Sequence, residues 1–342
     1  MIESLAAKLL DDSVRSRWTD TLPKKLHFMR VGTREVVENE GTVTLVVFPD
    51  NGPAQLVARI GKAACYDSLV EELHRVIEHL SSAVTGPSAS GLARPVMLDR
   101  IEGQLVSVYT FLPGRQLLGW VTEGGPLHRR RVRRELHGAA RWLAQFYHDT
   151  ASLRREVPAG EYLLDMHHRV ASDYGGTDAL SALFDRLVDR YGGDTLELGP
   201  AHGDYGPANL LWHRGRVAPI DWVQYGDLAP VGSDLVNLLT ARKVDREDGA
   251  VDESADIYRM ARRGHWYGTL AERVLNRHVT AAGDPQLTMV LGLAYFANRP
   301  VAEIGCRPEP CLRRAELLKD YASFCMSGAT SVVPARLAHW IE

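Results

Sequence analysis

The β-strand signals of this chain are concentrated in its first third, and this segregation constrains the fold more than any other feature of the sequence. Four short runs are strand-like, namely residues 42–48, 56–60, 95–98 and 105–111. The first two are rich in β-branched residues and flank the turn sequence PDNGP, which is typical of a β-hairpin. Between the two pairs, residues 68–81 carry apolar side chains at helical spacing.

Helical periodicity dominates the rest of the chain. Residues 1–22 have a helical pattern that stops at Pro23, and helical spacing resumes at about residue 126. Short strands and turns interrupt it only at 199–225. Separate strand and helix regions favour an α+β fold over an alternating, doubly wound one. We therefore expect a small β-rich N-terminal lobe over residues 1–112 and a larger helical C-terminal lobe over residues 113–342.

Composition excludes several classes of function. The formal net charge of -3 disfavours a nucleic-acid binder, since such domains carry a basic excess. The four cysteines form no close pair of the kind that binds zinc, and we expect them to be reduced. No apolar run approaches the ~18 residues of a membrane span. These features predict a soluble, cytoplasmic protein that binds neither nucleic acid nor membrane.

Oxygen-bearing side chains cluster in the stretch 201–235, around a loop and a hairpin. Asp204 lies in the loop, Asn209 precedes the hairpin, and Asp221 follows its second strand. Mg²⁺ in nucleotide sites is held by one or two carboxylates, water and phosphate oxygens, and Asn209 and Asp221 supply such ligands. Phosphoryl transfer also needs a carboxylate that accepts the proton of the attacking hydroxyl, and Asp204 is the candidate.

This pattern resembles the catalytic core of the aminoglycoside phosphotransferase/choline kinase superfamily, which is itself similar to protein kinases. The matching residues are His202, Asp204, Asn209 and the sequence Ile220-Asp221-Trp222. As in protein kinases, the asparagine follows the aspartate by five positions. The resemblance implies a protein-kinase-like two-lobed fold with Asp204 as base and Mg²⁺ on Asn209 and Asp221.

The resemblance also assigns roles to His202 and Asp234, and the loop itself suggests one for Tyr205. His202 would brace the catalytic loop, and Asp234 occupies the position of an acidic residue that anchors this loop in the family. Tyr205 directly follows the base, and we expect it to contact the substrate. The simpler interpretation is that Asp204 and Asn209 only form turns, but this does not account for the full set of matching residues.

In the N-terminal lobe the family places a basic strand residue that pairs with a glutamate on the following helix. Arg59 in LVARI is the best match, and Glu72 is its expected partner, with Glu71 as the second choice. Arginine in place of lysine departs from the family, because the planar guanidinium differs from an ammonium in reach and geometry. Lys62 is the alternative source of the charge.

The nucleotide-binding segments are only weakly marked. Residues 30–42 contain just Gly32 and Gly41, so the glycine-rich loop is degenerate, and a Walker A sequence is missing. Residues 108–114 (VYTFLPG) resemble the hinge whose backbone would bind adenine, which makes Tyr109 and Phe111 the expected contacts. A plain strand that ends in a Pro-Gly turn explains the same residues equally well.

Two charged runs have simpler explanations than substrate binding. Residues 128–134 (HRRRVRR) are the most basic segment, and a solvated helix face is favoured over an anion site. The acidic run over 245–256 contains Gly249 and is typical of an exposed loop, although acidic residues receive cationic substrates in the family.

Together these features predict a phosphotransferase that moves the γ-phosphoryl of ATP or GTP to a hydroxyl of a small molecule. Candidate acceptors are an antibiotic such as an aminoglycoside, a sugar, or an amino-alcohol metabolite. The alternative is a catalytically silent, kinase-like binding or scaffold protein. That alternative draws on Arg59 in place of lysine and on the degenerate glycine loop.

Overall fold

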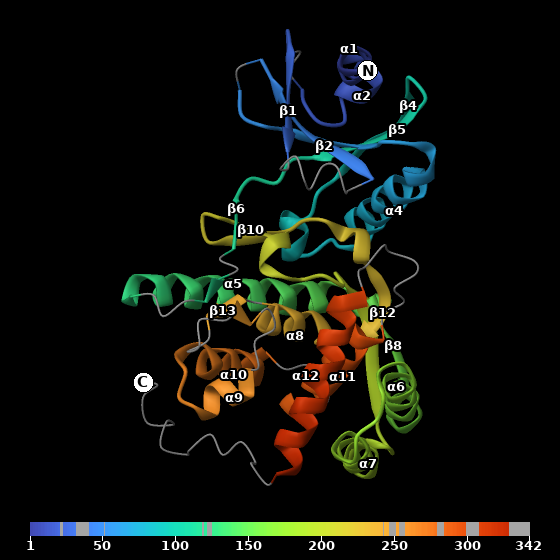
Figure 1. Cartoon of the computed structure of the whole chain (residues 1–342). Coiled ribbons are helices and arrows are strands. Elements are labelled where there is room, and N and C mark those ends of the chain that lie inside the picture. Colours follow the sequence, from blue (N-terminus) through green and yellow to red (C-terminus); the bar gives the residue numbers. More distant parts are fainter. Residues whose placement is uncertain are drawn as a thin grey trace. The chain divides into compact units, whose positions relative to one another are not determined.

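In the computed structural model, the chain forms two compact units (Figure 1). Unit 1 comprises Met1–Leu117 and Asn209–Tyr225, and unit 2 comprises Leu118–Ala208 and Gly226–Glu342. The α+β class is confirmed, whereas a domain boundary after residue 112 stays a prediction. The structure describes residues 1–20, 23–31, 41–50, 52–117, 120–121, 125–241, 243–245, 251–252, 257–278, 284–298 and 308–327.

Unit 1 is built on an antiparallel five-stranded sheet with the order β1-β2-β3-β5-β4. Its strands are β1 (Leu26–Val31), β2 (Thr42–Pro49), β3 (Leu56–Gly61), β4 (Pro95–Ile101) and β5 (Gln104–Thr110). The predicted hairpin is confirmed, because β2 and β3 pair antiparallel with Val47 opposite Leu56. Successive side chains along β3 point to opposite faces of this sheet.

Helices cover both faces of the five-stranded sheet. The face that carries Ala58 and Val108 belongs to the apolar core that also includes Leu5 and Leu9 of α1 (Ile2–Leu10). The opposite face packs against α4 (Asp67–Ala83), since His74 of this helix contacts Ser107 of β5. The helix predicted over 68–81 is thereby confirmed. Two-sided coverage explains the largely apolar sequences of β2 and β5.

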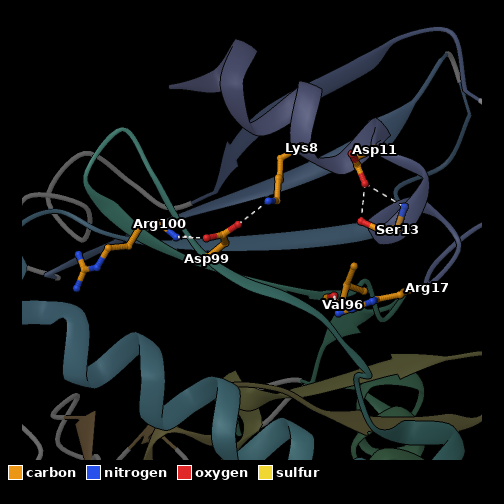
Figure 2. Close-up of polar contacts among 7 residues, drawn as sticks. All are labelled: Lys8, Asp11, Ser13, Arg17, Val96, Asp99 and Arg100. Atoms are coloured by element: carbon orange, nitrogen blue, oxygen red, sulfur yellow. Dashed lines mark hydrogen bonds and ion pairs between the residues drawn. The ribbon is translucent and has the colours of Figure 1, made fainter.

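The N-terminal helices are also attached to the sheet by polar contacts (Figure 2). Lys8 forms an ion pair of 2.8 Å with Asp99 of β4, and the guanidinium of Arg17 donates to the carbonyl of Val96 over 3.1 Å. The predicted helix over 1–22 is in fact two helices, α1 and α2 (Asp12–Arg15). Asp11 separates them, because its extended backbone and its side-chain oxygen cap the start of α2.

A small second sheet of unit 1 carries the hairpin predicted within 199–225. It has the order β11-β10-β6, with β6 (Arg115–Gln116), β10 (Leu210–His213) and β11 (Arg216–Pro219). Short 3-10 helices flank the two sheets: η1 (Ala64–Tyr66), η2 (Pro87–Gly91), η4 (Pro207–Asn209) and η5 (Trp222–Gln224). The chain enters unit 1 at Asn209 and leaves it after Tyr225, so this hairpin and its flanking residues form a single excursion.

Unit 2 is mostly helical. Its helices are α5 (Pro126–Asp149), α6 (Ala159–Tyr174), α7 (Asp178–Tyr191), α8 (Ser233–Thr240), α9 (Ile257–Arg262), α10 (Trp266–His278), α11 (Pro285–Ala297), α12 (Pro308–Met326) and the short η3 (Ala151–Leu153). Two three-stranded sheets accompany them, one of β8 (Arg155–Pro158), β9 (Thr195–Ala201) and β12 (Gly226–Pro230), the other of β7 (Trp120–Val121), β13 (Lys243–Asp245) and β14 (Val251–Asp252). None of the described helices is both long and apolar enough to span a bilayer.

The two charged runs lie in unit 2. The basic run occupies the first turns of α5, where Arg129, Arg130, Arg133 and Arg134 are exposed, which confirms a solvated helix face. Most of the acidic run over 245–256 lies outside the described residues. The same holds for residues 32–40 of the degenerate glycine loop.

Candidate active site

A buried carboxylate holds the predicted catalytic loop in unit 2. The loop begins where β9 ends, and Asp234 of α8 is fully buried beneath it. The Asp234 carboxylate accepts hydrogen bonds from the backbone amides of His202 and Gly203, over 2.6 and 3.0 Å. Gly203 has a φ of 79°, a conformation that glycine adopts without strain. The loop is thus fixed by charge-assisted hydrogen bonds at a position that requires glycine.

His202 braces the same loop from within. Its side chain is fully buried, and its Nδ1 atom accepts the backbone N–H of Asp204 over 3.2 Å. The amide of Gly206 in turn donates to the backbone oxygen of Asp204 over 2.7 Å. Within residues 201–207, Asp204 is half-buried and each of the other six is buried. The loop therefore presents a single carboxylate from an otherwise buried backbone.

Tyr205 does not contact substrate as predicted. It is fully buried, its hydroxyl donates to the carbonyl of Ala139 over 3.0 Å, and its ring stacks on Trp142. Burial, with a smaller effect of the Asp234 charge, raises the pKa of its hydroxyl well above the ordinary value. The prediction is wrong because the side chain after the base turns toward α5, and the local sequence does not show that packing.

The two predicted metal ligands flank the base of the hairpin in unit 1. The amide of Ile220 donates to the carbonyl of Asn209 over 2.8 Å, which closes the open end of the hairpin between them. Asp221 follows in a left-handed conformation (φ 62°, ψ 61°) that aspartate tolerates better than most residues, and its side chain is 43% exposed. An exposed carboxylate and an amide oxygen at one hairpin end fit the ligand preference of Mg²⁺.

Arg59 contacts the predicted metal ligand directly. One terminal nitrogen of its guanidinium lies 2.8 Å from a carboxylate oxygen of Asp221, and its Nε donates to Thr42 Oγ1 over 3.0 Å. The Arg59 charge also acts on the Tyr109 hydroxyl. Burial raises the pKa of Tyr109 to about 12, and the Arg59 charge opposes that shift. Unit 1 thus brings Arg59 together with Asp221 and with Thr42, and neither contact was predicted from the sequence.

The predicted pair of Arg59 and Glu72 is not formed. Glu72 is 45% exposed and pairs instead with Arg75, three residues later on α4. The helix turns a different residue toward the sheet, namely His74, whose Nδ1 lies 2.9 Å from the Ser107 hydroxyl. The signal was present in the sequence, because the apolar stripe of 70, 73 and 77 places residue 74 on the buried side and residue 72 on the solvent side.

Two backbone N–H groups of the predicted hinge already donate hydrogen bonds within unit 1. The amide of Thr110 donates to the carbonyl of Arg94 over 2.9 Å, and the amide of Phe111 donates to that of Gln55 over 2.8 Å. The Phe111 N–H can therefore reach an adenine only by giving up an existing hydrogen bond, which argues against this predicted contact. The nucleotide contact expected of Tyr109 stays a prediction.

Comparison with known proteins identifies the class of the chain. A model of the phosphotransferase enzyme family matches residues 39–282, which is most of the sequence. The chain belongs to this phosphotransferase enzyme family. It is accordingly a small-molecule kinase, and the predicted enzyme class is confirmed. No curated protein sequence matches the chain.

Two solved structures show the kinase-like two-lobed fold for this phosphotransferase. A putative fructosamine-3-kinase from Thermobifida fusca YX-ER1 is 15% identical, with 96% of this chain and 100% of that chain covered and a TM-score of 0.53. A thermostable mutant of aminoglycoside phosphotransferase APH(4)-Ia, in ternary complex with ADP and hygromycin B, is 14% identical. That likeness covers 89% of this chain and 95% of the other, with a TM-score of 0.51.

Proposed function

We propose that this phosphotransferase transfers the γ-phosphoryl of ATP or GTP to a hydroxyl of a small molecule, with Asp204 as the base. The observation that carries the proposal is the catalytic loop itself. Asp234 and His202 fix its backbone from beneath, and Asp204 is the only residue of 201–207 that is not buried. A carboxylate held in this way is positioned to orient an attacking hydroxyl and to accept its proton.

The chemical step follows from these groups. The acceptor hydroxyl gives its proton to Asp204 while its oxygen bonds to the γ-phosphorus. The bond between that phosphorus and the oxygen bridging to the β-phosphate breaks, and the nucleoside diphosphate leaves with the bridging oxygen. Mg²⁺ bound by Asn209 and Asp221 would neutralise charge on the phosphate oxygens. Positioning and charge neutralisation carry most of such a reaction, so few groups suffice.

Arg59 is proposed to bind phosphate oxygens of the nucleotide. Its guanidinium is permanently charged, only 13% exposed and already directed at Asp221. With nucleotide present, we expect Arg59 to exchange part of its contact with Asp221 for phosphate, which leaves that carboxylate for the metal. In this role Arg59 would supply the charge that the missing lysine left open, which is one of the two grounds for the alternative of a silent, kinase-like scaffold; the degenerate glycine loop is the other.

The acceptor is proposed to be a sugar, a sugar-containing antibiotic or an amino alcohol. The structural neighbours named above include a putative fructosamine kinase and a phosphotransferase crystallised with ADP and hygromycin B. Their likeness supports the kinase fold, and their names support a polyhydroxylated acceptor as the first class to try. A cytoplasmic location and a role in antibiotic resistance are parts of the same proposal.

The test is nucleotide consumption with Mg²⁺ across aminoglycosides, sugars and amino alcohols, with mass spectrometry to detect an added phosphate. Asp204→Ala is expected to lower kcat by about 10²- to 10⁴-fold, the contribution of a general base. Asp165→Ala is the matched control, because it removes a 53% exposed carboxylate of unit 2 that pairs with Arg169 on the same helix. Unchanged turnover in the Asp204 variant would exclude this residue as the base.

A further inference from the structure

A second polar side chain lies beside the catalytic loop, on the buried helix α8. Asn237 is only 4% exposed, and Arg314 of α12 donates to its Oδ1 over 2.8 Å. The same guanidinium donates to the hydroxyl of Thr240 over 2.7 Å. Arginine has donors and no acceptor, so the oxygen of the Asn237 amide must face Arg314. The orientation of the amide is thereby fixed, and its Nδ2 atom must lie on the other side.

That nitrogen lies near the base. A Cβ added to Gly206 would lie 3.8 Å from Oδ1 of Asp204 and 4.0 Å from Nδ2 of Asn237. The third neighbour of this point is the Cβ of Ala241, at 3.7 Å. Gly206 has no positive φ, so its backbone does not require glycine. Its missing side chain instead leaves a small space that a carboxylate acceptor and an amide donor both border.

The Asn237 Nδ2 atom is buried and makes no hydrogen bond within the described part of the chain. A buried amide nitrogen carries two N–H donors, and an unsatisfied group of this kind in a native protein calls for a specific partner. A purely structural role, holding Arg314, needs only the oxygen of this amide. The nitrogen therefore points to a ligand atom that accepts a hydrogen bond, next to the carboxylate that accepts the proton of the reacting hydroxyl.

We propose that Asn237 determines acceptor specificity by donating a hydrogen bond to an oxygen on the carbon next to the reacting hydroxyl. The inference rests on the proposed role of Asp204 as base. A 1,2-diol, as in a sugar or polyol, presents two oxygens one carbon–carbon bond apart, and these can meet Asp204 and Asn237 together. An ammonium in place of the second oxygen has only N–H donors, so it would face the N–H donors of the Asn237 amide and could not accept from them. The positive charge of Arg314, which contacts the same amide, would repel it as well. The acceptor is thus a vicinal diol rather than an amino alcohol.

Sequence patterns alone do not show this site. Asn237 lies in an apolar helix, and Arg314 lies beyond residues 39–282, the part that the family model matches. Arg314 is a positioning residue in this scheme, because it acts on the substrate only through the Asn237 amide. Asn237 itself would touch the acceptor.

The test is ligand-observed NMR binding of matched probes to the full chain with Mg²⁺ and a non-hydrolysable ATP analogue. The probes are D-glucose and its 2-amino-2-deoxy analogue. Wild-type protein is expected to bind glucose more tightly than the amine. Asn237→Leu should weaken glucose binding about tenfold, and Asn237→Asp should reverse the preference, since a carboxylate accepts from an ammonium. Thr240→Val removes another partner of Arg314, together with the hydrogen bond that Thr240 donates to the Val236 carbonyl, and should change glucose binding less than about twofold, a control for lost hydrogen bonding on the same helix.

Gly206→Ala provides an independent route, because its added methyl group meets only ordinary van der Waals contacts and should fill the space without unfolding the protein. It is expected to lower glucose affinity as well. Equal binding of glucose to the wild type and Asn237→Leu, preference of the wild type for the amine, or no glucose binding at all would each overturn the inference. Binding that depends on Asn237 without phosphate transfer would instead refute the proposed kinase reaction.

Discussion

Replacing Asp234 should loosen the catalytic loop by an amount that its contacts define. The fully buried carboxylate accepts two backbone N–H groups, over 2.6 and 3.0 Å. Hydrogen bonds to a charged group contribute about 1.5–3 kcal/mol each, which gives about 3–6 kcal/mol for the pair. Removing the charge also removes its desolvation cost, which returns part of this energy. Asp234→Ala should therefore lower the free energy of opening the loop by about 2–4 kcal/mol.

The assay is hydrogen exchange followed by mass spectrometry on peptides that contain His202 and Gly203. Since about 1.4 kcal/mol corresponds to a factor of ten, exchange of these two amides should accelerate by about 30- to 1,000-fold. Asp234→Asn keeps the shape and one acceptor oxygen but turns an NH₂ group toward the other amide, and about half the loss is expected. Peptides from α4 in unit 1 serve as the internal reference and should not change.

Two results would refute this reasoning. Exchange at His202 and Gly203 within about threefold of the wild type, in a folded Asp234→Ala protein, would show that the two hydrogen bonds do not hold the loop. Equal acceleration across unit 1 and unit 2 would show global unfolding rather than local loosening. Turnover should fall together with protection, because Asp204 lies directly after the two anchored amides.

Three further predictions concern charge and protonation. Arg59→Met should weaken binding of Mg²⁺-nucleotide about tenfold or more in calorimetry, by loss of a charge on the phosphates, and unchanged affinity would remove Arg59 from the site. Because burial raises the pKa of Tyr109 to about 12, the folded state holds its proton above the ordinary value of 10.0. Stability should thus fall as pH rises from about 10 to 12, and urea titrations at pH 9 and 11 should show a smaller fall for Tyr109→Phe. Burial lowers the pKa of several histidines below 6.5, so stability is present above that pH and lost as pH falls through it, and the thermal midpoint should be lower at pH 5.5 than at 7.5. Equal midpoints would contradict this assignment, which concerns His74, His137, His167 and His278.

The sequence predicted those features of the molecule that depend on local pattern. Alternation and turn residues are enough to identify β2, β3 and the hairpin between them, and apolar spacing is enough to identify α4. The spacing of Asp204, Asn209 and Asp221 indicated a phosphotransferase, and the family match confirms that class, whereas the roles of the three residues stay predictions. Local signals of this kind can be recognised in the sequence without knowledge of the tertiary structure.

Contacts between distant segments were beyond sequence reasoning. Arg59 and Asp221 are 162 positions apart, so their ion pair follows from the packing of the hairpin and not from any pattern in either segment. The burial of Tyr205 depends on α5, whose Ala139 lies 66 positions earlier. Glu72 is a different case, because the apolar stripe of α4 already placed it on the solvent side, and the family resemblance was preferred over that stripe.

The N-terminal helices make the folded unit 1 larger than the part of it that the family model matches. The match to the family model begins at residue 39, whereas the core of unit 1 already includes Leu5 and Leu9. A protein trimmed to the shared region would uncover the apolar face of the sheet formed by residues such as Val47 and Ile60. Such a face favours self-association. A protein trimmed to residues 39–282 should therefore aggregate, although Arg59, Asp204 and Asp221 would still be present, and it would also lack Arg314.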